Sequence, residues 1–212
     1  MKQHNHWKLS QLQKTIIKIV LWGFGIVLLF ITLVLKIALD YDVLSEIISV
    51  ISIVLGCSLA LVERVLWKTR IMKLPFLENY WTPVLEGRWK GTLVRDNVPH
   101  DFVIEIKQSF TSISCITYSK HSSSSAYAAE ILYNDQLRNY KLVYYWHGGT
   151  TTVQENTGDS NTFEGFTVLD IIIESEKVTK LTGSYFTNRQ PKQTKGTLNL
   201  EFGQKELKNS FE

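Results

Sequence analysis

Two long apolar runs open the chain, and short alternating segments fill the remainder. The first run covers about residues 16–38, and no charged residue interrupts Ile19–Leu35. As a helix this run would be roughly 35 Å long, which is enough to cross a bilayer with some tilt. The second run covers about residues 44–66 and also has the length of a span. The pattern therefore predicts two transmembrane helices within residues 1–73.

The charges around these runs predict their orientation. Lysines precede the first run, and four basic residues follow the second run between Arg64 and Lys73, whereas the connection Asp40-Tyr41-Asp42 is acidic. Lys and Arg are retained on the cytoplasmic side, so both termini are expected in the cytoplasm. No small-residue cleavage site follows the first run, which indicates an anchor rather than a removed signal peptide. A buried, soluble helical hairpin is the alternative.

Small residues recur every four positions in the second run, at Ser52, Gly56 and Ala60. Such a series lies on one helical face and allows another helix to approach closely. Two interpretations stay open. The face either associates with other protomers in the membrane or packs on the first helix of the same chain.

Beyond a linker at residues 74–83, the pattern changes to period two. Phe102, Ile104 and Ile106 alternate with residues that are expected to face outward, as in half-buried strands. Cutting residues 84–212 at Gly, Pro, Asn, Asp and Ser clusters gives eight strands: Gly87–Arg95, Asp101–Phe110, Ser112–Lys120, Ala126–Asn134, Tyr140–His147, Phe163–Ile173, Val178–Thr187 and Thr194–Phe202. Eight short strands without intervening helices predict a small antiparallel up-and-down β-barrel on the cytoplasmic side.

Three polar segments are interpreted as connections. The run Ser122–Ser125 is expected to be a hairpin loop, and the glycines at 148 and 149 are expected to form part of a turn. Thr150–Thr162 has the composition of a long mobile loop that would cap the barrel.

Charge and motifs exclude several functions. The net charge of +3 belongs to the N-terminal segment, because Leu74–Glu212 carries 14 Lys and Arg against 16 Asp and Glu. Polymeric nucleic acid is therefore not an expected partner. No histidine or cysteine spacing suggests a metal site, and no phosphate-binding or nucleophile motif is present. Cys57 and Cys115 suggest no disulfide. We expect no enzymatic activity, no cofactor and no metal.

The barrel is rich in aromatic residues that could line a binding site. If Leu142, Tyr144 and Trp146 face inward, they form a flat lining suited to stacking on a base or ring. Basic residues near strand ends could meet phosphates at a barrel mouth. The candidate ligand-binding residues are Arg88, Tyr118, Tyr144, Trp146, Tyr185 and Arg189. Core packing of the aromatic residues and solvation of the charges are the alternatives.

Local motifs and the layout together resemble known families. Gly87-Arg88-Trp89 is similar to the Gly-x-Trp opening of lipocalin-like barrels, in which the Trp plugs one end. The barrel segment opens with Leu85-Glu86-Gly87-Arg88-Trp89-Lys90-Gly91 and closes with Lys195-Gly196-Thr197-Leu198-Asn199-Leu200-Glu201-Phe202. With two transmembrane helices before it, the chain resembles the two-transmembrane β-barrel effector of bacterial CBASS antiphage defence.

This resemblance implies a function. The barrel would sense a cyclic dinucleotide made by a functionally linked nucleotidyltransferase during infection. Binding would drive oligomerisation, and the assembled helices would disrupt the inner membrane and kill the infected cell. Two other classes remain open: a membrane-anchored carrier or sensor of a lipophilic molecule, and a scaffold whose barrel is filled with side chains.

Overall fold

The computed structural model describes residues 23, 25–27, 30, 31, 34, 41–68, 82–134, 136–150, 162–189 and 193–212. These residues belong to two compact units, each considered by itself. The barrel unit contains Thr82–Gln108 and Ser112–Glu212, and the helical unit contains the helices and the short segment Ser109–Thr111.

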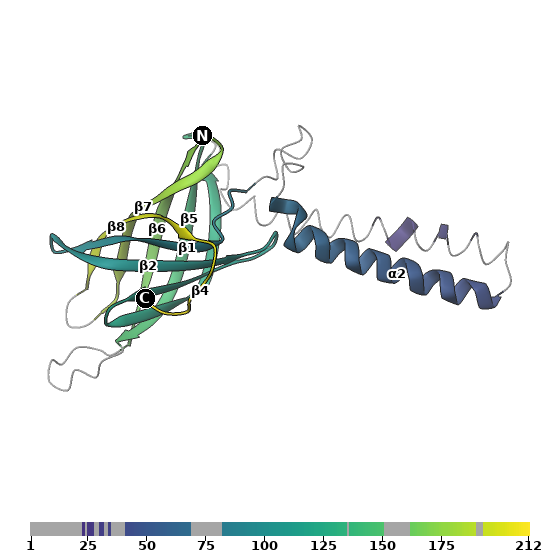
Figure 1. Cartoon of the computed structure of the whole chain (residues 1–212), viewed down its shortest axis with the longest axis horizontal. Helices are drawn as coiled ribbons and strands as arrows, with labels where there is room; N and C mark the ends of the chain where they lie inside the picture. Colours follow the sequence, from purple (N-terminus) through teal and green to yellow (C-terminus); the bar gives the residue numbers. More distant parts are fainter. Residues whose placement is uncertain are drawn as a thin grey trace, which may run out of the picture. The chain divides into compact units, whose positions relative to one another are not determined.

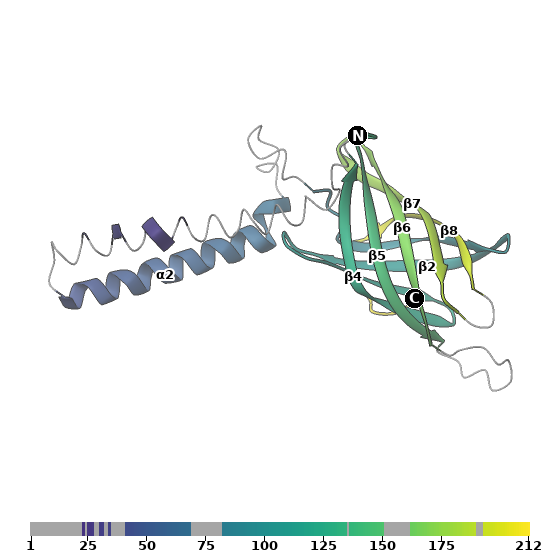
Figure 2. The same cartoon turned by 180° about the vertical axis from the view of Figure 1, so that it is seen from behind.

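The barrel unit confirms the expected architecture. Eight antiparallel strands follow one another around a closed barrel, and the last pairs with the first. Figures 1 and 2 show its two sides. The strands are β1 (Gly87–Arg95), β2 (Val98–Gln108), β3 (Ile113–Ser119), β4 (Ser122–Asn134), β5 (Asn139–Thr150), β6 (Thr162–Glu174), β7 (Lys177–Thr187) and β8 (Lys195–Gln204).

Two expected connections are wrong, because both segments belong to strands. Ser122–Ser125 is the start of β4, and Gly148-Gly149 lies within β5. The serines pair with β3 on one side and with β5 on the other, where Ser124 lies opposite Gly148. Two complete ladders outweigh the weak strand propensity of Ser and Gly. The predicted capping loop Thr150–Thr162 falls almost wholly outside the described residues.

Two-residue turns fix the register at two hairpins. Asp96 and Asn97 connect β1 to β2 with φ of 50° and 64°, and Ser175 and Glu176 connect β6 to β7 with φ of 48° and 66°. Positive φ at both central residues is typical of type I′ turns, whose twist matches that of the strands. The turns therefore fix which residues of the adjoining strands face the barrel interior.

The helical unit contains α2 (Tyr41–Arg64) and the 3₁₀ turn η1 (Leu66–Lys68). Glu63, near the end of α2, accepts hydrogen bonds from the hydroxyl of Ser109 at 2.5 Å and from the hydroxyl of Thr111 at 2.6 Å. Among the described residues, no helix has both the length and the hydropathy needed to cross a bilayer. Most of the first expected span and nearly all of the expected linker lie outside the described residues.

Candidate ligand-binding end of the barrel

Large apolar side chains fill the half of the barrel in which β1 begins, here called the plugged end. Leu85 and Trp89 are at most 1% exposed, and Trp89 Nε1 donates a hydrogen bond of 2.8 Å to the carbonyl of Leu85. Trp89 is therefore a core residue. The other buried apolar residues of this half are Ile104, Ile106, Cys115, Ile131, Leu142, Leu169, Ile171, Leu181 and Leu200.

Small and polar residues replace aliphatic side chains at many inward positions of the opposite half, here called the polar end. By strand parity these positions are Gly91, Thr117, Ser124, Gly148, Gly165, Thr167, Thr187 and Gly196. Large rings also remain at inward positions there: those of Phe102 and Phe163 are half-buried, and those of Trp146 and Tyr185 are 7% and 8% exposed. The polar end thus offers hydroxyl groups and aromatic rings, the groups that an amphipathic ring-bearing ligand requires.

The rings of Trp146 and Tyr185 each lie against a glycine on the neighbouring strand. Trp146 is paired with Gly165, where an added Cβ would lie 2.4 Å from indole Cζ2. Tyr185 is paired with Gly196, where an added Cβ would lie 2.8 Å from ring Cε1. A glycine in a strand often marks such a close approach. The two glycines allow the rings to lie along the barrel wall.

Thr167 forms hydrogen bonds with both Tyr144 and Trp146 of β5. Trp146 Nε1 donates a hydrogen bond of 2.9 Å to Thr167 Oγ1. Burial raises the pKa of Tyr144 far above its ordinary value, nearby Cys115 raises it further, and a hydrogen bond with Thr167 partly opposes the rise. The Tyr144 phenol is therefore neutral. On the adjoining strands, the hydroxyl groups of Thr117 and Ser124 are also hydrogen-bonded.

Two guanidinium groups lie near the strand ends of this half. The Arg189 guanidinium lies 5.3 Å from the ring centroid of Phe163, and the loop before it is fixed because Asn188 N donates to the carbonyl of Glu164 at 2.9 Å. Arg95 ends β1. Burial raises the pKa of Tyr185, the charge of Arg95 partly lowers it, and the charge of Asp96 raises it further.

The structure separates the six candidate ligand-binding residues. Tyr144, Trp146 and Tyr185 face inward, and Arg189 follows the polar end of β7. Tyr118 alternates with the inward residues Cys115 and Thr117 and so faces outward. Arg88, expected at a barrel mouth, instead lies on the outer face of the plugged end, fully buried beneath the C-terminal segment. Its neighbour Trp89 takes the inward position.

Five further residues of the polar end were not among the sequence-based candidates: Arg95, Phe163, Gly165, Thr167 and Gly196. The period-two pattern could have placed Thr167 two positions from Gly165 on the same face. It could not have indicated which glycine meets which ring, because that depends on the register between strands.

The described residues offer little reactive chemistry. No group of three or more His, Cys, Asp or Glu among them could hold a metal ion. Cys115 is fully buried, and desolvation raises its pKa to about 12, which leaves the thiol protonated and unreactive at neutral pH.

The expected assembly face of α2 is exposed. Ser52, Gly56 and Ala60 are exposed, whereas the half-buried side of the helix follows Ile51, Leu55 and other positions at helical spacing. An added Cβ at Gly56 would meet nothing within 4 Å. The small-residue series and the half-buried side are thus adjacent but different faces.

Comparison with known proteins identifies the barrel. Residues 80–201, more than half of the chain, match the family described as Cap15, cyclic dinucleotide receptor domain. The match begins just before β1 and ends within β8, so it covers the barrel. No curated protein matches the chain in sequence.

Proposed function

The chain belongs to the Cap15 cyclic dinucleotide receptor family, and on that premise we propose that the polar end of its barrel binds a cyclic dinucleotide. The family match over the whole barrel carries this proposal. The chain is accordingly a sensor of CBASS antiphage defence, responding to a nucleotide signal from a functionally linked nucleotidyltransferase.

The chemistry of the polar end supports this ligand. A cyclic dinucleotide presents two flat bases and two phosphates. Trp146 and Tyr185 supply rings for stacking, Thr167 and Tyr144 supply hydroxyl groups, and the guanidinium of Arg189 can donate paired hydrogen bonds to phosphate. A lipophilic ligand could pack on the rings but would leave the hydroxyl groups and the guanidinium unused.

The membrane-disrupting part of the proposal depends on the helices. Apolar side chains along α2 are largely exposed, among them Val50 (60%), Ile53 (65%) and Val54 (58%). Exposed apolar surface of this kind is typical of a lipid or protein contact. The sequence pattern supports two membrane-spanning helices with both termini and the barrel in the cytoplasm.

Assembly in the membrane connects ligand binding to membrane disruption. The exposed face of Ser52, Gly56 and Ala60 permits close approach of a second helix. Aromatic side chains on the outer face of the polar end, such as Tyr145 and Phe186, are exposed on the same strands as the proposed ligand contacts. A ligand drives assembly only if it binds the assembled state more tightly.

A titration of the full chain in detergent tests the binding step. The unfolding midpoint is measured against a panel of cyclic di- and trinucleotides, with fatty acids as controls, because a ligand selective for the folded state raises the midpoint. One cyclic dinucleotide is expected to give a saturable rise. A rise with a fatty acid alone would indicate the lipophilic-carrier class, and no response to any compound would indicate a filled scaffold.

A charge substitution tests the location. Arg189→Gln is expected to weaken binding roughly 10- to 100-fold, which corresponds to the loss of a charge-assisted hydrogen bond. Arg138→Gln is the matched control, because it removes the same charge from the exposed β4–β5 turn at the plugged end. Equal affinities of the two variants would contradict the assignment.

A further inference from the structure

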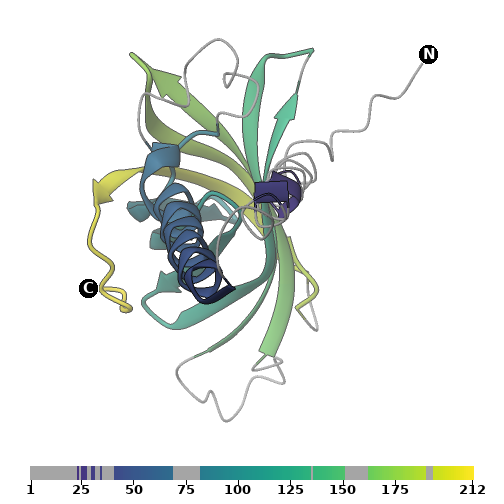
Figure 3. The ribbon, with the colours of Figure 1, turned by 90° about the vertical axis from the view of Figure 1, so that its right-hand side faces the viewer.

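The C-terminal segment Lys205–Glu212 crosses the seam between β8 and β1, the last and the first strand of the barrel. In an up-and-down barrel, successive strands are joined by short connections, but β8 and β1 meet only by pairing. After β8, the segment passes over the outer face of β1 and reaches β2. Figure 3 shows this yellow segment outside the ring of strands.

A buried ion pair on the outer face receives this segment. Arg88 of β1 and Glu105 of β2 are opposite each other in the ladder, with side chains 0% and 2% exposed and Nη1 and Oε1 2.5 Å apart. Removing one member of such a pair leaves an uncompensated buried charge. Each charge is therefore compensated by the other, and both side chains also form hydrogen bonds with the C-terminal segment.

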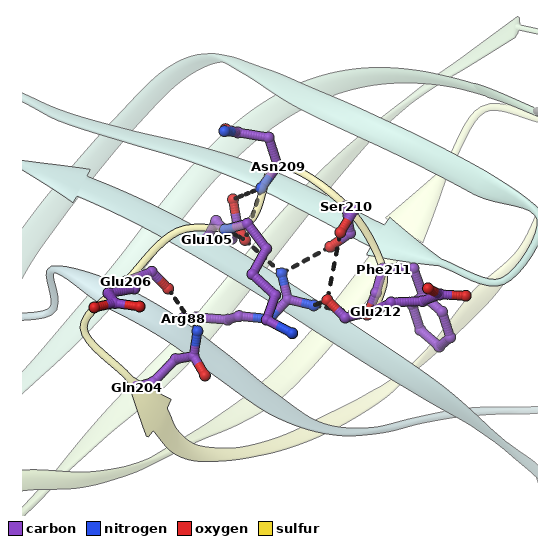
Figure 4. Close-up of polar contacts among 9 residues, drawn as sticks. Arg88, Glu105, Gln204, Glu206, Asn209, Ser210, Phe211 and Glu212 are labelled. Carbon is purple, nitrogen blue, oxygen red and sulfur yellow. Dashed lines mark hydrogen bonds and ion pairs between the residues drawn. The ribbon is translucent and has the colours of Figure 1, made fainter.

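The pair recognises the main chain of the segment from two directions (Figure 4). Arg88 donates to the main-chain oxygens of Ser210 at 2.7 Å, Phe211 at 2.6 Å and Glu212 at 2.8 Å. With Glu105, these acceptors use all four hydrogens of its two Nη atoms.

The carboxylate of Glu105 receives donors from the preceding residues. The N–H groups of Lys208 and Asn209 donate to it at 2.8 Å and 3.1 Å. Asn209 adopts φ of 54°, a left-handed conformation that Asn tolerates well. Such a turn directs successive N–H groups toward one anion.

One side chain of the segment also contributes. Phe211 borders an open hollow of about 390 Å³ on the same outer face, together with Lys90, Thr92, Asp101 and Val103. The aromatic side chain therefore lies beside a hollow of the outer face, whereas the hydrogen bonds of the segment to Arg88 and Glu105 are made through main-chain atoms.

We propose that Arg88, Glu105 and the adjoining hollow form a peptide-binding site, which the chain fills with its own residues 205–212 and thereby holds the β8–β1 seam closed. Its ligand class is a short peptide with a left-handed turn followed by three successive main-chain oxygen acceptors and an aromatic side chain. This site is separate from the polar end and does not depend on the proposed nucleotide function.

Complementation with a synthetic peptide tests the site. The chain is truncated after Gln204, kept otherwise intact in detergent, and titrated with a peptide of the sequence Lys205–Glu212. The truncated chain should have a lower unfolding midpoint than the full chain, and the peptide should restore it saturably. The full chain should not respond, because its attached segment has a much higher effective concentration.

Control peptides separate main-chain recognition from unspecific binding. A peptide with Asn209→Pro lacks one N–H donor and cannot adopt positive φ, so it should not restore the midpoint. A peptide with Asn209→Gly should act like the native one, and a peptide with Phe211→Ala should bind several-fold more weakly. Equal action of the proline and glycine peptides would overturn the proposal, as would an unchanged midpoint on truncation.

Amide hydrogen exchange and two full-length variants provide further tests of the seam role. On truncation, amide exchange should rise first in the β1–β8 ladder, and peptide should reverse it; an unchanged ladder would contradict the seam role. If the truncated chain does not fold with or without peptide, full-length Asn209→Pro and Asn209→Gly are compared. The proline variant must then be the less stable, and equal midpoints would overturn the proposal.

Discussion

The two ends of the barrel use the same strands for different purposes. At the plugged end, Leu142 and Leu169 belong to the same buried hydrophobic cluster as Trp89, which supplies stability. At the polar end, the same strands β5 and β6 place Trp146 over Gly165 and hydrogen-bond it to Thr167. A uniform period-two pattern can therefore hide a change of role along each strand, because the size and polarity of the inward residues decide that role.

The largest effect is expected at the plugged end. Leu142→Ala should lower the free energy of unfolding by about 2–5 kcal/mol, because it removes a fully buried side chain and leaves a cavity. Leu137→Ala, at a side chain that is 68% exposed, should change it by less than about 0.5 kcal/mol. Denaturant titration measures both, and the ligand affinity of the folded Leu142→Ala chain should be unchanged. A selective loss of affinity would show that the two ends are not separate.

A smaller effect on stability but a larger effect on binding is expected at the polar end. Gly165→Ala would place a Cβ 2.4 Å from Trp146 and 2.6 Å from the main-chain oxygen of Phe186, so both the ring and the neighbouring backbone must shift. The expected cost is about 1–3 kcal/mol, with a clear loss of affinity for the cyclic dinucleotide. Gly203→Ala is the control, since its Cβ would lie no closer than 3.1 Å to any neighbour. Native affinity in Gly165→Ala would argue against a role for the Trp146 ring.

The smallest effect appears with pH. Burial raises the pKa of Cys115 from near 9 to about 12 and raises that of Tyr144 above its ordinary value near 10. The unfolded chain releases these protons first, so stability should be constant near neutral pH and fall as pH rises above about 9, by up to about 1.4 kcal/mol per pH unit for each group. Cys115→Val should fall less between pH 9 and 10. An identical slope would contradict the assignment to this thiol.

The sequence predicted the barrel well because its signal is local. Alternation such as Phe102, Ile104 and Ile106 gave the strand count and the antiparallel order, and strand parity correctly placed Tyr144 and Trp146 inside. The serine run at the start of β4 was missed, because its strand conformation depends on pairing with two neighbours rather than on propensity.

The site was harder to predict than the fold. Arg88 was expected at a barrel mouth as a basic residue near a strand end, but its position depends on Glu105 and on a segment more than one hundred residues away. The glycines behind Trp146 and Tyr185 carry no chemistry of their own in the sequence. The positions of these residues therefore depend on contacts between segments that are distant in the sequence, which local patterns do not show.

Amide hydrogen exchange of the full chain, with and without the cyclic dinucleotide that raises its unfolding midpoint, would show directly whether the polar end binds this ligand. New protection is expected at the polar end, in β5 around Trp146, in β6 around Thr167 and in β7 around Tyr185, with little change around Trp89 and Leu142. Protection confined to the plugged end or to the outer face around Arg88 would contradict it.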